Sequence, residues 1–149
     1  MGDAVVFLVG EGASLDGVLL QHAQLHGLSL PGADMDGVRA AHADLAKSDL
    51  SGASMQYADL GGADLEGTEL TKAELNCANL DRTDMEGAKL EGALLSGATL
   101  RGANNLNCPQ LQSGVDWEKT IRDKKHACGR AILSSPDWQA LCPDRDRAS

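Results

Sequence analysis

The stretch that decides the fold is "ADLGGADLEGTELTKAELNCANLDRTDMEG", residues 58–87, in which a small residue, a polar residue and Leu or Met recur every five positions. Neither regular element explains that period. Five residues advance an α-helix by about 140°, so the leucines would scatter around the cylinder. In a straight strand the side chains alternate, so leucines five apart would fall on opposite faces. The chain must therefore bend at regular intervals.

The repeat keeps one register over eighteen pentads, from Ala13 to Gly102. When the central residue of each pentad is called position i, it is Leu in fourteen pentads, Met in three and Ala at Ala40. Position i−2 is Ala in twelve pentads, and neither position ever carries a charge. Residues two apart on an extended chain point the same way, so positions i and i−2 are predicted to face a common core.

A corner follows each inward pair. Position i+2 is Gly in eleven of the eighteen pentads, and Gly adopts turn dihedrals with the least strain. A chain that bends in the same direction every five residues must coil, and stacked coils can pair backbone to backbone at about 4.8 Å. The pattern thus predicts an all-β solenoid with a narrow core of Leu and Ala.

Composition and charge limit the function. A chain of 149 residues with 42% hydrophobic residues makes about one domain. The net charge of −9 argues against direct binding of nucleic acid or of an anionic membrane, and it favours a basic protein partner. No stretch reaches the roughly 18 apolar residues of a membrane span, and residues 4–10, AVVFLVG, lack the positive flank and length of a signal peptide. These features predict a cytoplasmic protein.

The pentads "ADLGG", "ADLEG", "ANLDR" and "ADMDG" are similar to the consensus A-(D/N)-L-x-x of the pentapeptide-repeat proteins. The resemblance implies a right-handed quadrilateral β-helix with four pentads per coil. Over the repeat region, residues 13–106, this amounts to about 4.5 to 5 coils.

The two ends of a solenoid expose an unpaired strand edge and need caps. We expect residues 1–12, which contain Phe7, to form an N-terminal cap, and residues 107–149 to form a helical C-terminal tail that folds over the last coil. Two tail helices are predicted from spacing and turn residues. One is an amphipathic helix beginning near Ser113 with Trp117, Ile121, Cys128 and Ile132 on one side, and the other is a shorter helix in "SSPDWQALC", residues 134–142.

If four pentads make one coil, residues twenty apart stack, and each column forms part of a flat face. The face whose centres are Leu25, Leu45, Leu65 and Met85 has a formal charge of −4. Stacked carboxylates repel one another, which makes this face a candidate surface for a basic partner. The alternative is a solvated face, because Asp at position i−1 belongs to the family consensus itself. The candidate partner face consists of Asp44, Asp64, Glu66, Asp84 and Glu86.

The histidines and cysteines offer few sites. His22 and His42 should be stacked neighbours, but their column supplies no third ligand, so no metal site is expected. Cys77 lies at an outward corner and is expected to be a free thiol. The tail around Cys108 and Cys128 is similar to tails with a spaced Cys pair in some bacterial pentapeptide-repeat proteins, which makes these two a candidate disulfide. An oxidised pair, with a leader removed, would place the protein in a periplasm or lumen instead, whereas reduced thiols fit the cytosol equally well.

Catalysis has little support, because a narrow solenoid filled with apolar side chains offers no cleft for converging catalytic groups. We expect no enzyme activity and no cofactor. The first function class is a non-enzymatic, rigid protein–protein interaction or scaffold module. The alternative follows from the resemblance: some members are DNA mimics that bind type II topoisomerase (gyrase) and protect it from inhibitors. The sequence leaves the oligomeric state open between a monomer and an end-to-end dimer.

Overall fold

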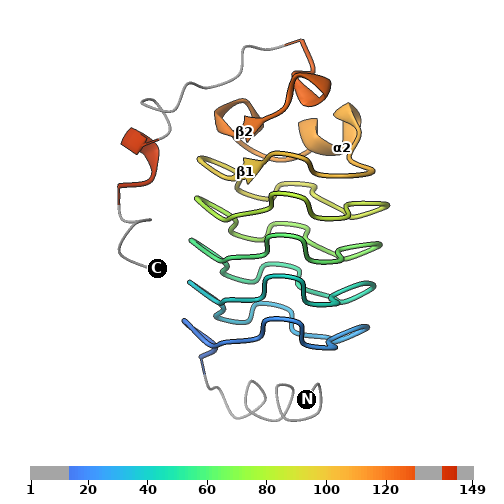
Figure 1. Cartoon of the computed structure of the whole chain (residues 1–149), viewed down its shortest axis with the longest axis vertical. Coiled ribbons are helices and arrows are strands. Elements are labelled where there is room, and N and C mark those ends of the chain that lie inside the picture. Colours follow the sequence, from blue (N-terminus) through green and yellow to red (C-terminus); the bar gives the residue numbers. More distant parts are fainter. Residues whose placement is uncertain (1–13, 130–138, 144–149) are drawn as a thin grey trace.

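The computed structural model describes residues 14–129 and 139–143. Figure 1 shows a stack of similar coils, with the described chain up to residue 129 lying over one end and the short segment 139–143 beside the stack. Every backbone bridge within the repeat is parallel and joins residues twenty apart, as in Asp44 to Asp64 and Asp64 to Asp84. Four pentads therefore make one coil, and the protein is a β-helix.

The core consists of the two inward columns that the five-residue period predicts. Leu at position i and Ala at position i−2 are buried throughout the described repeat, and Leu65 has 0% of its surface exposed. Where Ala40 interrupts the column of large residues, Val38 is the neighbouring inward residue, and both are fully buried. Two inward residues are polar, and their hydroxyls form hydrogen bonds with the preceding coil. Ser48 donates to the carbonyl of Leu25 at 3.0 Å, and Thr68 donates to the carbonyl of Leu45 at 2.9 Å.

Each corner is a turn that requires a left-handed residue. The N–H of Ala63 donates to the carbonyl of Leu60 at 2.9 Å, and Gly62, the third residue of that turn, has φ +67°. This is the geometry of a type II turn, which Gly adopts without steric strain. Seven non-glycine residues nevertheless occupy such corners, at a cost of about 1 kcal/mol each. They are His22, His42, Lys47, Tyr57, Lys72, Cys77 and Arg82.

The C-terminal cap contains only short elements. These are β1 (Thr99–Leu100) in the last coil, then α2 (Cys108–Gln112), η1 (Trp117–Lys119), β2 (Ile121–Arg122) and η2 (Lys124–His126), where η denotes a 3-10 helix. The 3-10 helices and β2 take the place of the amphipathic helix expected from Ser113, so that prediction was wrong for residues 113–129.

The reason is the open edge of the last coil. Val115 pairs with Leu94, and β2 pairs with β1 in parallel, with Ile121 opposite Thr99. Exposed N–H and C=O groups of the final coil thus find partners in the chain that follows, which a helix could not supply. The apolar residues that suggested a helix still face inward, since Trp117 and Ile121 are both buried.

Helix α2 begins at a capping box, in which Asn107 and Gln110 exchange side-chain and backbone hydrogen bonds. The Gln110 amide also donates to the carbonyls of Met85 and Ala88 at 2.7 Å, which fastens the helix to the coil below. The predicted N-terminal cap with Phe7, the position of Ile132 and the start of the helix in 134–142 lie outside the described residues, although 139–141 form one helical turn. In the part of the chain that the structure describes, no helix is long and apolar enough to cross a membrane.

The core predicts a sharp contrast between two leucines. Leu65→Asp places an unpaired charge in the column where exposure is 0%, and should lower the free energy of unfolding by roughly 3–5 kcal/mol. Leu19→Asp is the matched control, because Leu19 is 64% exposed at an outward position, and should change stability by only about 0.5 kcal/mol. Urea denaturation followed by circular dichroism measures both. Equal stabilities of the two variants would contradict this account of the core.

Candidate partner-binding surfaces

On the predicted acidic face, carboxylates of successive coils are stacked in a ladder. Asp44, Asp64 and Asp84 are consecutive partners in parallel bridges, so their side chains leave the same column on three successive coils. Glu66 and Glu86 lie two residues further along their pentads and are exposed. The structure thus brings together all five residues of the predicted face.

The three aspartates also have a local role. In each, Oδ1 accepts the backbone N–H two residues later, at 3.1 Å for Asp44, 2.9 Å for Asp64 and 3.1 Å for Asp84. Such a bond satisfies an outward N–H at the start of each corner, which gives a physical reason for Asp at position i−1. The glutamates make no such bond to the backbone in the described chain, so their charge is the more available for a partner.

Few cations neutralise this ladder. His26 lies 3.6 Å from Asp44, and Lys47 lies 3.8 Å from Glu66, both at exposed sites. Asn105 contributes a neutral hydrogen bond to Asp84 at 2.9 Å. Contacts of this kind between exposed groups contribute little energy and weaken further in salt.

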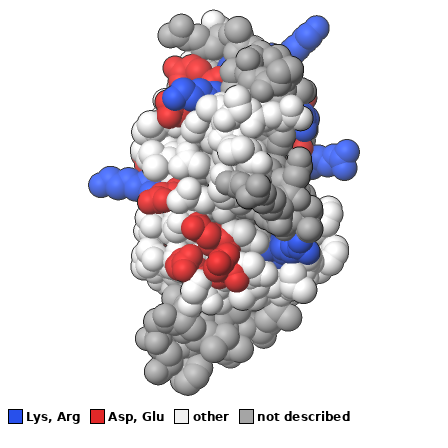
Figure 2. Space-filling model, turned by 90° about the vertical axis from the view of Figure 1, so that its left-hand side faces the viewer, with Lys and Arg blue, Asp and Glu red and all other residues white. Residues whose placement is uncertain are grey.

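Acidic side chains also gather elsewhere on the solenoid, and Figure 2 shows one such patch with Lys and Arg side chains projecting from its flanks. The face opposite the predicted one carries Asp16, Asp34, Asp36 and Glu74. There, Asp36 accepts hydrogen bonds from the Ser54 hydroxyl at 2.6 Å and the Gln56 N–H at 2.8 Å. Two opposite faces are therefore acidic, which gives a matched control surface for any binding experiment.

A polar groove of about 700 Å³ lies along the face that carries Arg82 and Arg101. Gly61 and Gly62 form part of its lining; a Cβ at Gly62 would lie 2.5 Å from Nδ1 of His42, so a side chain there would displace the imidazole. The carboxylates of the groove, such as Asp59, are already bonded to backbone N–H groups. Sequence analysis missed this groove, although the pair of adjacent glycines in "ADLGG" was a signal for it.

The predicted histidine stack is present. The rings of His22 and His42 lie 5.3 Å apart with an interplanar angle of 7°. Face-to-face stacking turns the ring nitrogens away from a shared ion, and residues 14–129 and 139–143 contain no group of three side chains suited to hold a metal.

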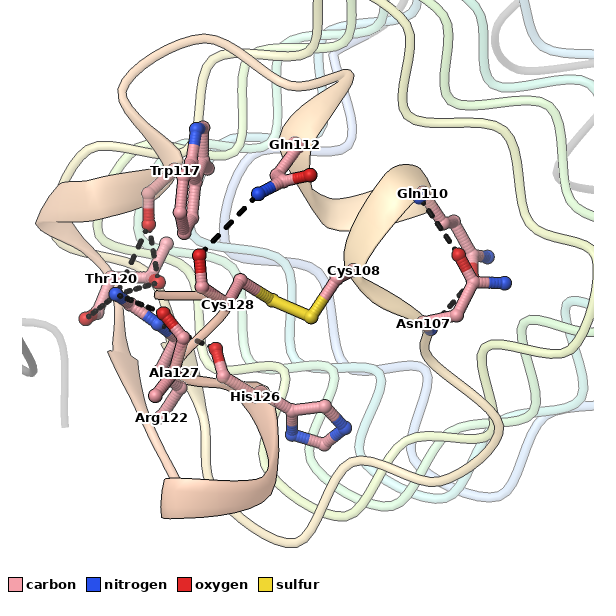
Figure 3. Close-up of a disulfide and its surroundings, with 10 residues drawn as sticks. All are labelled: Asn107, Cys108, Gln110, Gln112, Trp117, Thr120, Arg122, His126, Ala127 and Cys128. Atoms are coloured by element: carbon pink, nitrogen blue, oxygen red, sulfur yellow. Dashed lines mark hydrogen bonds between the residues drawn. A yellow bond between two sulfur atoms is a disulfide. The ribbon is translucent and has the colours of Figure 1, made fainter. Parts of the chain in front are cut away.

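The cap is organised around a buried guanidinium, shown in Figure 3. Arg122 donates to the carbonyls of His126 at 2.8 Å and Thr120 at 3.1 Å, and its guanidinium carbon lies 5.1 Å from the centre of the Trp117 ring. Burial lowers the pKa of Arg122, and the nearby Glu118 carboxylate opposes that shift. The charge is thus held by carbonyl dipoles and an aromatic face, which fixes the path of the chain from η1 to η2.

Two disulfides tie the C-terminal region to itself and to the solenoid. Cys108, at the start of α2, is bonded to Cys128, which follows η2 (Figure 3). Cys77 is bonded to Cys142, so the expectation of a free thiol at Cys77 was wrong. The error has a physical cause: the period of the repeat places Cys77 at a corner, but it contains no information on the path by which the tail returns to that corner.

His126 gives the cap a pH dependence. It is 4% exposed, and its Nδ1 has no hydrogen-bond partner among the described residues. Burial lowers the pKa of His126, Lys125 and Arg122 lower it further, and Asp123 opposes them. Because the folded state disfavours the protonated ring, the unfolded state binds more protons as the pH falls below about 6.5.

Stability should therefore be full above about pH 6.5 and fall at lower pH until the folded-state pKa is passed. In His126→Gln the slope of unfolding free energy against pH should be smaller than in wild type in that window. Chemical denaturation at pH values from 5 to 8 measures this. Identical slopes in wild type and His126→Gln would show that His126 does not carry the effect.

Comparison with known proteins agrees with this geometry. The model of the pentapeptide-repeat family matches residues 33–71, 48–87 and 78–104, with eight copies. The chain belongs to the pentapeptide-repeat family, whose members are right-handed β-helices. No catalytic family was found, and a search of curated proteins gave no match.

Solved structures of the same family resemble the chain. Rfr23 from the cyanobacterium Cyanothece 51142 is 30% identical over 72% of this chain, with a TM-score of 0.45, and this chain spans only 62% of its length. A pentapeptide repeat protein from the Arabidopsis thaliana thylakoid lumen is 27% identical, over 66% of this chain and 72% of that one, with a TM-score of 0.51. QnrB1, a plasmid-mediated fluoroquinolone resistance protein, is 16% identical over 81% of this chain and 71% of its own, with a TM-score of 0.48.

Proposed function

We propose that this protein is a non-enzymatic, rigid interaction or scaffold module whose flat faces bind protein partners. The observation that carries the proposal is the twenty-residue ladder, because it sets outward side chains such as Asp64 and Asp84 at fixed positions on successive coils. A surface that is already ordered loses little conformational entropy on binding. The parallel ladder and the buried columns beneath it provide that order.

The partner that fits the predicted face is a basic protein surface. Five carboxylates stand against Lys47, which leaves a formal charge of −4 on this face. Charge complementarity of this kind raises the rate of association at low salt, and the gain fades once the Debye length falls to about 8–10 Å. Nucleic acid is not proposed as a ligand, because the chain as a whole carries −9.

The test neutralises one acidic face at a time. Asp64→Asn, Glu66→Gln, Asp84→Asn and Glu86→Gln together should weaken capture of a basic partner about tenfold or more without lowering stability, since Asn still accepts the turn N–H. The control changes Asp16, Asp34 and Asp36 to Asn and Glu74 to Gln, which alters the net charge equally on the opposite face. Affinity capture from the source cell at two salt concentrations compares the two baits with wild type. If both variants lost the same partner to the same extent, the predicted acidic face would be a solvated surface and not a specific binding site.

Topoisomerase binding by DNA mimicry is the second candidate. The support for this candidate is the net negative charge of the chain. The repeat, however, carries about one net negative charge per 2.8 Å along the stack, against about one per 1.7 Å in duplex DNA. If the partner in the experiment above is gyrase, wild-type protein should change supercoiling in competition with DNA. Unaltered supercoiling at micromolar protein would remove this candidate and leave the interaction module in place.

The two disulfides lead us to propose an oxidising compartment, a periplasm or lumen, rather than the cytoplasm. Disulfides persist in such compartments and are uncommon in the cytosol. The Arabidopsis relative comes from the thylakoid lumen, which is consistent with this choice. A non-reduced peptide map of protein from its native cell should contain the Cys108–Cys128 crosslink. Free thiols at both positions would favour the cytoplasm as the compartment of this protein.

A further inference from the structure

One corner of the solenoid is covered, and it is the corner that holds a cysteine. Of the eighteen i+2 positions from Gly17 to Gly102, only Cys77 and Gly97 are buried, while the others are exposed or half-buried. Cys77 and Gly97 lie one above the other on successive coils, because they are twenty residues apart. They are covered by Cys142 and Leu141, from a five-residue segment, 139–143, that lies along the side of the stack (Figure 1). We call residues 139–143 the strap.

The strap rests in a space at the Gly97 corner, which we call its seat. This space exists because glycine has no side chain. A Cβ at Gly97 would collide with Sγ of Cys142, and it would lie 3.1 Å from Sγ of Cys77 and 3.5 Å from Cβ of Leu141. Only glycine at this corner leaves room for the bond between Cys77 and Cys142, which spans 65 residues of sequence. The sequence and the fold are thus matched at three positions to place one disulfide on the outside of the solenoid.

Apart from this bond, the strap buries little. Four of its five residues are exposed, and only Cys142 is buried. Segments with few buried contacts open locally at low free energy, so both sulfurs can become accessible without unfolding of the coils. The other disulfide differs in this respect, because Cys108 and Cys128 are part of a cap that the capping box at Asn107 and the Arg122 hydrogen bonds also hold.

We propose that the Cys77–Cys142 bond is a thiol–disulfide exchange site, reduced by a dithiol, and that its reduction releases the strap. One thiolate of the dithiol attacks a sulfur of the bond, giving a mixed disulfide and one protein thiolate; the second thiolate then displaces the other protein sulfur. The protein gains two electrons and two protons as Cys77 and Cys142 become thiols, and the dithiol becomes a disulfide. Release uncovers the corner at Gly97 beside the acidic face that contains Glu74. This inference goes beyond the proposed function and does not depend on it.

The first experiment uses dithiothreitol as the dithiol probe on the whole chain. Across buffers of increasing reduced-to-oxidised ratio, alkylation and peptide mass spectrometry report each disulfide, and hydrogen exchange reports residues 139–143. We expect thiols at positions 77 and 142 to appear together with an exchange rate at least tenfold higher at the strap amides of residues 139–142, since Pro143 has no N–H, while circular dichroism of the coils stays unchanged. A strap that remains protected after reduction, or a bond that is reduced only when the coils unfold, would overturn the proposal.

Two glycine variants separate the seat from general strain. Gly97→Ala fills the space that Cys142 occupies, while both cysteines stay in the chain. Gly87→Ala imposes a similar left-handed strain, with φ +65° against +74°, at a corner where the new Cβ meets nothing closer than 3.9 Å. Without reductant, Gly97→Ala should show alkylatable thiols at 77 and 142 and the fast exchange of the reduced strap. Gly87→Ala should behave like oxidised wild type. Protection of both cysteines in Gly97→Ala would overturn the assigned seat.

Discussion

The constraint on which the structure depends is backbone pairing between coils at an offset of twenty residues. The N–H of Leu65 donates to the carbonyl of Asp84, and the N–H of Asp64 donates to the carbonyl of Ala43, at 2.9 and 3.0 Å. These bonds alternate up and down the stack, so the N–H groups of Asp64 and Leu65 are satisfied by the preceding and the following coil. An insertion of one residue would shift inward side chains to the outside. The unbroken register of eighteen pentads follows from this requirement.

The same pairing creates the need for a cap. The last complete coil ends with N–H and C=O groups that have no next coil, and the chain after Gln112 supplies partners through Val115 and β2. Because this segment lacks the pentad pattern, other forces must fix its path. The buried Arg122 provides them through several carbonyls, together with the Cys108–Cys128 bond. The cap is thus an irregular continuation of the solenoid rather than an added helical unit.

The outward residues divide into those that serve the fold and those left for binding. Aspartates at position i−1 accept turn N–H groups, so their presence is explained without a partner. Glutamates at i+1, such as Glu66, have no such backbone bond in the described chain, and the non-glycine corners carry backbone strain that the turn itself does not require. Recognition is more reasonably sought at these positions than in the acidity of the repeat as a whole.

The sequence by itself determined the repeat, its inward columns and corners, and the family, because a strict five-residue period fits neither a helix nor a straight strand and places Leu65 and its equivalents on one inward side of a chain that bends regularly. Together with the four pentads per coil that the family resemblance implied, it also predicted the acidic ladder and the His22–His42 stack, since both follow from the offset of twenty. Only the tertiary structure decided the form of the cap, the bond from Cys77 to Cys142 and the groove at Gly61–Gly62. These depend on where an aperiodic chain returns and on which side chains fill a corner, and local spacing contains no information on contacts made 65 residues apart.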